Sequence, residues 1–145
     1  MKIKAALEIA KRIQEEEPLE RMLCTNSQEV YRLFLPSLSY LPHEEFWVGY
    51  LNHCNQVILH CCMSKGGITS TTVDIRLIYK KALEIGATGL VLAHNHPSGN
   101  LEPSAADKQL TQRFVESAKT LDIRVLDHLI VSEKGYFSFA DKNLL

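Results

Sequence analysis

The spacing of apolar residues along the chain predicts a mixture of helices and strands. Residues 3–16 repeat apolar positions every three or four residues, which is typical of a helix with one buried face. The charged residues and proline that follow end this pattern. A second helix is expected to begin at a cap formed by Asn26 or Ser27. It should stop at Pro36, because proline disfavours helical backbone in the residue before it.

The repeat changes from helical to alternating in the next segment. Residues 44–63 alternate around a turn at 52–55, so a β-hairpin is expected there. Thr71 or Thr72 can cap a following helix that ends before Gly86, a residue suited to the left-handed conformation at a helix C-terminus. This helix should run from Val73 to Ile85, with Val73, Leu77, Ile78 and Leu83 facing inward.

The last third of the chain continues the alternation of strands and helices. The continuous apolar run at 89–93 is typical of a buried central strand, and a polar loop is expected at 94–103. Ser104 should open a helix that reaches about Leu121. Two further strands are expected at 123–131 and 136–139. The fold class is therefore α/β or α+β, with a mixed central sheet flanked by helices.

Composition narrows the class of protein. The 145 residues suit one folded domain, and 46% apolar residues with a net charge of −1 exclude extensive disorder. No apolar run approaches the length of about 18 residues that a membrane span needs. The N-terminus lacks the features of a secretory signal, so a cytoplasmic protein with reduced thiols is expected. The near-neutral charge does not favour nucleic-acid binding by bulk electrostatics.

One polar segment carries the residues expected to do chemistry. His94 and His96 directly follow the predicted buried strand. Residues i and i+2 of extended backbone project to the same side, so their two imidazoles can bind one ion. Asp107, in the first turn of the next helix, can supply a third ligand. Two nitrogens, one carboxylate oxygen and an open fourth position are typical of a catalytic rather than a structural zinc site.

Each of these residues also has a structural interpretation. Ser104 and Asp107 form the pattern of a helix capping box, which is compatible with metal binding because a carboxylate has two oxygens. His128 lies in an apolar strand and is expected to be a hydrogen-bonded core residue. The other histidines, His43, His53 and His60, are expected at the surface, and residues 65–67 are expected to form a turn.

The segment also resembles a known family. The spacing His-x-His-x7-Ser-x2-Asp is the metal-binding signature of the JAB/MPN-type (JAMM) metalloproteases, matched here by His94, His96, Ser104 and Asp107. The run AHNHPSGNLEPSAAD, with LDHLIV downstream, resembles the RadC family of bacterial JAMM-like proteins. The resemblance covers residues 22–145 and leaves 1–21 as an N-terminal helix or linker. It implies the JAB/MPN architecture, which is similar to that of cytidine deaminases.

The resemblance further implies zinc-dependent hydrolysis of a peptide or isopeptide bond. The implied Zn²⁺ ligands are His94, His96 and Asp107. An upstream glutamate in the form Glu-x-Phe would hold the attacking water and take its proton, which points to Glu44, with Glu45 as the alternative. Adjacent strand residues point to opposite faces, so only one of the two can reach the site. Ser104 would donate a hydrogen bond to the developing oxyanion.

Two other functions remain alternatives. The family's naming associates it with DNA repair, but the helix-hairpin-helix region of the full-length family is not expected in this chain. A metal-free interaction scaffold is the second alternative, and the intact ligand set argues against it. The expected partner is a peptide or protein substrate rather than nucleic acid or a membrane. The first helix is interpreted as a linker or a dimer contact, which leaves a homodimer open.

Overall fold

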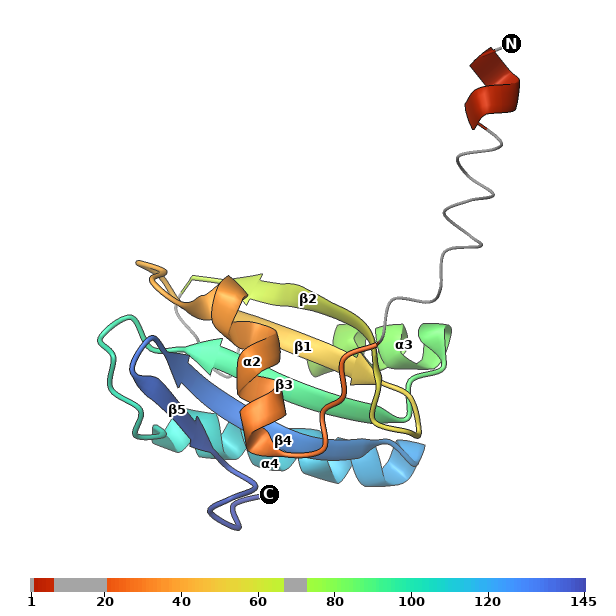
Figure 1. Cartoon of the computed structure of the whole chain (residues 1–145). Coiled ribbons are helices and arrows are strands. Elements are labelled where there is room, and N and C mark those ends of the chain that lie inside the picture. The colour runs from red at the N-terminus through yellow and green to blue at the C-terminus, as the bar shows by residue number, and fades with distance from the viewer. Residues whose placement is uncertain (1, 7–20, 67–72) are drawn as a thin grey trace.

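A five-stranded sheet forms the centre of the protein, in a computed structural model that describes residues 2–6, 21–66 and 73–145 (Figure 1). The strand order is β2-β1-β3-β4-β5, with β3 and β4 parallel and every other neighbouring pair antiparallel. The mixed sheet confirms the predicted fold class. The strands are β1 (Glu45–Leu51), β2 (Val57–Lys65), β3 (Gly89–Asn95), β4 (Arg124–Ser132) and β5 (Gly135–Ser138).

Helices cover both faces of this sheet (Figure 1). Helix α2 (Ser27–Leu38) packs on one face, where Leu33 and Phe34 meet apolar side chains of β3 and β4. Helices α3 (Ile75–Ile85) and α4 (Ala105–Leu121) cover the other face. A parallel pair of strands needs a crossover connection, and α4 provides it between β3 and β4. The N-terminus of α4 therefore lies beside the carboxyl end of β3, the edge at which open sheets commonly bind ligands.

Helix α2 differs from its predicted end. Asn26 is the cap, since its side chain accepts a hydrogen bond from the Glu29 amide. The expected stop at Pro36 is wrong, because the helix continues to Leu38. Proline removes one helical hydrogen bond. The buried Leu38 side chain and the two bonds that Ser39 donates to the Leu35 carbonyl keep the last turn in place.

Helix α3 differs from the prediction in its cap and in the residues that face inward. Its cap is Asp74, whose side chain accepts from the Arg76 amide, rather than Thr71 or Thr72, which lie outside the described residues. Leu77 and Leu83 do not face inward, because their exposures are 55% and 59%. The helix has two competing apolar stripes, and packing selects the one that contains Ile75, Ile78, Tyr79 and Ala82.

The remaining elements follow the prediction more closely. The hairpin of β1 and β2 is antiparallel, and Gly86 ends α3 with a φ of 71°. Strand β3 extends to Asn95, so His94 and Asn95 belong to the strand and not to the expected loop. Residues 2–6 are helical, while most of the helix expected over 3–16 lies outside the described residues. None of the helices described here is long and apolar enough to cross a membrane.

Gly49 permits the close packing of α2 on the sheet. A Cβ atom at this position would lie 2.7 Å from Val91 Cγ2 and 3.3 Å from Leu33 Cδ2. We predict that Gly49→Ala lowers the free energy of unfolding by about 1–3 kcal/mol, because overpacking forces side chains from their preferred rotamers. Urea unfolding would measure this loss. The exposed Leu83→Ala change is the control and should stay within about 0.5 kcal/mol, and equal losses in both variants would contradict this account of the packing.

Candidate metal centre

The two histidines of the motif are placed by the central strand β3. This strand is buried along its whole length between β1 and β4, and its alternation directs His94 toward the face covered by α4. His96 follows one residue beyond the strand and projects to the same side. The two Nε2 atoms lie 3.1 Å apart. The structure therefore confirms that both imidazoles point toward one place.

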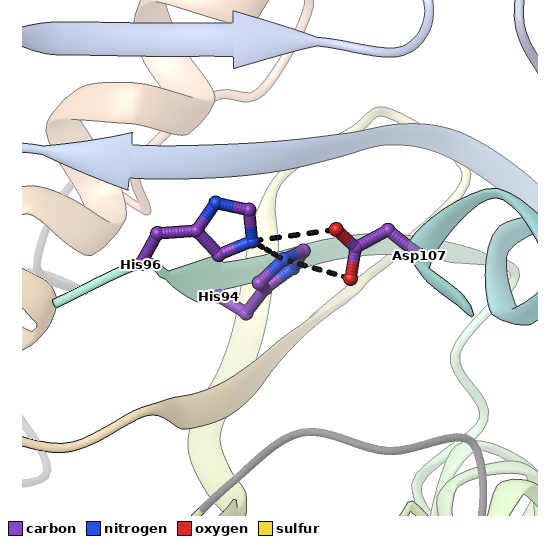
Figure 2. Close-up of side chains that lie close together, drawn as sticks. All are labelled: His94, His96 and Asp107. Atoms are coloured by element: carbon purple, nitrogen blue, oxygen red, sulfur yellow. Dashed lines mark hydrogen bonds and ion pairs between the residues drawn. The ribbon is translucent and has the colours of Figure 1, made fainter. Parts of the chain in front are cut away.

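Asp107 reaches this place from the first turn of α4. Its Oδ1 atom lies 3.3 Å from His94 Nε2, and its Oδ2 atom lies 3.3 Å from His96 Nε2 (Figure 2). Oδ2 also accepts a hydrogen bond from the Ser104 amide, while Ser104 Oγ accepts one from the Asp107 amide. The capping box and the convergence on the histidines are both present. The expectation that the two roles are compatible is consistent with this geometry.

The spacing of these donor atoms suits a metal ion. Tetrahedral ligands about 2.0–2.1 Å from zinc lie roughly 3.3 Å from one another. The two imidazole nitrogens lie 3.1 Å apart, and each lies 3.3 Å from a different oxygen of the Asp107 carboxylate, which is close to that value. Among the residues that the structure describes, this is the one group of three histidine, cysteine or acidic side chains close enough to hold an ion. The group can therefore bind a metal, and its three protein ligands are one fewer than a tetrahedral ion takes.

Electrostatics at the centre favour a charged carboxylate. Burial alone would raise the pKa of Asp107, but the His94 and His96 imidazoles beside its two oxygens outweigh burial and hold that pKa well below its usual range. The hydrogen bond to Asp107 likewise raises the pKa of His96, against the opposing effect of burial. The charge of Glu44 adds a smaller contribution in the same direction. Negative charge therefore gathers where a cation would be bound.

The remaining ring nitrogens of both histidines are hydrogen-bonded. His96 Nδ1 donates to the Asn100 carbonyl at 2.6 Å. His94 Nδ1 lies 2.9 Å from His128 Nε2, and His128 Nδ1 lies 2.6 Å from Thr111 Oγ1. Burial is the main cause that lowers the pKa of His128 well below its usual value, so its ring is neutral near pH 7. His128 is thus the hydrogen-bonded core residue that was predicted, but its contact with a ligand was not foreseen.

The pairing of β1 with β3 separates Glu44 from Glu45. Phe46 is the register partner of His94, so the face that carries Phe46 also carries His94. Alternation directs Glu45, the first residue of β1, to the opposite face, whereas Glu44 precedes the strand and its charge contributes to the raised pKa of His96.

Glu45 is 6% exposed, and its carboxylate accepts hydrogen bonds from Trp47 Nε1 at 2.8 Å and from His43 Nε2 at 2.9 Å. Burial would raise the pKa of Glu45, but these bonds lower it. The carboxylate of Glu45 is therefore occupied by neighbours on the face opposite His94. The role of Glu44 as a base stays a prediction, as does the role of Ser104 toward an oxyanion.

Asn95, between the two histidines, holds the backbone around Glu44. Its Oδ1 accepts from the Glu45 amide at 2.8 Å, and its Nδ2 donates to the His43 carbonyl at 2.9 Å. The Gly66 amide donates to the Glu44 carbonyl at 2.8 Å from the opposite side. Sequence reasoning missed this contact, although the position of Asn95 inside the motif was a signal. It also missed Thr111, one helical turn after Asp107.

The other histidines singled out in the sequence are not members of the group of three. His53 and His60 are exposed, as predicted, and His60 packs beside the Trp47 ring. His43 has a 45% exposed side chain despite its bond to Glu45. Of the turn expected at 65–67, Lys65 is the last residue of β2, Gly66 has a φ of 90°, and residue 67 lies outside the described residues.

Comparison with known proteins identifies relatives of this chain. A family model described as the RadC-like JAB domain matches residues 24–144. A UPF0758 protein of Flavobacterium johnsoniae is 49% identical over 142 residues, which cover 98% of this chain and 62% of the relative. A UPF0758 protein of Porphyromonas gingivalis is 45% identical over 144 residues, covering 99% and 63%.

The similarity extends to further bacteria. UPF0758 protein YfjY of Escherichia coli is 50% identical over 105 residues, covering 72% of this chain and 66% of the relative. The chain thus spans less than two thirds of the length of these relatives. The family match covers most of the chain and includes every residue of the His94, His96 and Asp107 group. The chain therefore belongs to the RadC-like JAB domain family.

Proposed function

We propose that this chain is a zinc-dependent hydrolase of the JAMM type that cleaves a peptide or isopeptide bond. The observation that carries the proposal is the convergence of His94 Nε2, His96 Nε2 and the Asp107 carboxylate within 3.3 Å of one another. Two imidazoles and one carboxylate suit zinc, and three protein ligands leave a position for reaction. Membership of the JAB superfamily supports a hydrolase.

The residues around the centre have distinct tasks in this mechanism. Zinc held by His94, His96 and Asp107 would lower the pKa of water to about 7 and polarise the scissile carbonyl. Glu44 takes a proton from the attacking water and returns it to the leaving nitrogen. Ser104 Oγ already accepts from the Asp107 amide, so its hydroxyl hydrogen can point to the developing oxyanion.

The composition of the centre speaks against cleavage of nucleic acid. Nucleases commonly hold hard cations with several carboxylates, whereas the described group has one carboxylate and two imidazoles. The net charge of −1 offers no general attraction for a polyanion. Among the possible hydrolytic reactions, cleavage of an amide bond therefore fits this chain best.

The proposed function predicts the metal content of the protein. We expect about one zinc per chain in protein offered zinc and then dialysed, because three convergent donors complete a catalytic site. His96→Ala should lose the metal, since it removes one of the three. His53→Ala changes an exposed histidine away from the centre and should retain it. Elemental analysis would measure all three proteins, and wild-type protein without zinc would favour the scaffold function.

A further prediction separates the two adjacent glutamates. Glu44→Gln should keep its zinc and lose hydrolysis by about 10²–10⁴-fold, because it removes the proton acceptor and no metal ligand. Glu45→Gln should keep both, because its carboxylate bonds Trp47 and His43 instead. Cleavage of a peptide library, followed by mass spectrometry, would compare the variants. Full activity of Glu44→Gln beside an inactive Glu45→Gln would reverse the assignment.

A further inference from the structure

A continuous chain of buried hydrogen bonds runs behind His94 and has no part in the mechanism above. Thr111 Oγ1 lies 2.7 Å from the Asp107 carbonyl oxygen and 2.6 Å from His128 Nδ1. His128 Nε2 lies 2.9 Å from His94 Nδ1. All three side chains are fully buried, so no water competes for these bonds. These hydrogen bonds join the backbone of Asp107 to the ring of His94, and both residues are proposed metal ligands.

The chemistry of the groups fixes the direction of every bond in this chain. A carbonyl oxygen can only accept, so the Thr111 hydroxyl donates to Asp107. The hydroxyl oxygen then accepts from His128 Nδ1–H. Both nitrogens of the fully buried His128 ring face Thr111 and His94 rather than a carboxylate, so the ring is neutral and has one N–H. That N–H is on Nδ1, which leaves Nε2 as an acceptor for His94 Nδ1–H. The proton of His94 therefore lies on Nδ1, and its lone pair lies on Nε2, the atom that faces His96 and Asp107.

We propose that Thr111 and His128 are positioning residues that hold His94 in its metal-binding tautomer. This inference rests on the proposed function, because it assigns the two residues to the zinc centre. Ligand histidines generally donate their second ring N–H to a partner that fixes tautomer and orientation, and loss of such a partner typically weakens metal binding about 10–100-fold.

The two ligands differ in how this partner is supplied. His96 donates to the Asn100 carbonyl, which lies four residues away in its own loop. His94 lies on β3 and depends on His128 from β4 and Thr111 from α4. Three separate elements must therefore pack correctly before His94 presents its lone pair. This series of hydrogen bonds begins at the Asp107 carbonyl, so it also aligns the first turn of α4 with the end of β3.

The surroundings of His128 keep its ring in one orientation. The ring stacks on Phe139 with centroids 4.9 Å apart and an interplanar angle of 11°. Phe46 meets it edge-on at 5.6 Å. An apolar side chain could fill this space equally well, so packing alone does not require an imidazole. The hydrogen bonds to Thr111 and His94 are what such a replacement would remove.

Thr111 offers a matched pair of variants to test the role. Thr111→Val keeps the shape of the side chain and removes the hydroxyl, whereas Thr111→Ser retains the hydroxyl. In the full chain, competition with a chromophoric chelator would measure zinc affinity. We expect Thr111→Val to bind zinc about 10–100-fold more weakly than wild type, and Thr111→Ser to bind close to wild type. Urea unfolding of the metal-free proteins would show that both variants are folded.

A second readout reports the tautomer directly. ¹⁵N NMR of the metal-free protein should place the His94 proton on Nδ1 in wild type and Thr111→Ser. In Thr111→Val it should show a mixture of the two neutral tautomers, with the proton on Nδ1 or on Nε2. If Thr111→Val does not fold, His128→Gln and His128→Leu make the same comparison, because glutamine can both accept from His94 and donate to Thr111. His128→Gln should then bind zinc more tightly than His128→Leu.

The outcomes separate this inference from the proposed function. Wild-type affinity for zinc in Thr111→Val, with an unchanged His94 tautomer, would overturn the positioning role alone. Loss of zinc binding in Thr111→Val and Thr111→Ser alike would also overturn it, since the retained hydroxyl would then have no effect. Failure of wild type to bind zinc would overturn the proposed function, and the role of Thr111 and His128 in metal binding with it.

Discussion

The burial of a polar imidazole inside the sheet is the constraint on which this structure depends. His94 has no exposed surface, and a buried polar group without partners costs free energy that packing does not return. Its two nitrogens therefore need partners from outside β3. His128 supplies one, and the group formed by His96 and Asp107 supplies the other. The crossover through α4 is the connection that brings Asp107 and Thr111 to this point.

The capping box of α4 serves this constraint as well as helix stability. Without the capping hydrogen bonds to Ser104, the Asp107 side chain could adopt several rotamers. Its Oδ2 is instead held by the Ser104 amide at 2.8 Å, which leaves Oδ1 directed at His94. A helix cap typically contributes about 1 kcal/mol to stability. The same bonds also fix a negative charge beside two imidazoles, so stabilisation of the helix and formation of the centre share one set of atoms.

The sequence was sufficient to predict those parts of the centre that depend on local geometry. His94 and His96 share a side because of strand alternation, and Asp107 faces them because it lies at the third position of a capped helix. Thr111 and His128 were missed because their contacts depend on how α4 and β4 pack. Packing also decided two of the errors in the helices. The buried Leu38 extends α2 past Pro36, and a second apolar stripe of α3 is the one that packs on the sheet.

Because side chains alternate along β3, the proposed metal ligands and the residues that support them lie on opposite faces of the sheet. His94 and His96 project to the α4 side, while Asn95 projects to the α2 side and bonds the backbone on both sides of Glu44. Glu45 shares that second face, where Trp47 and His43 fix its carboxylate. A shift of one residue in the pairing of β1 with β3 would exchange the two glutamates between faces. The side-chain bonds of Asn95 oppose that shift, so one residue of the motif holds the register on which its neighbours depend.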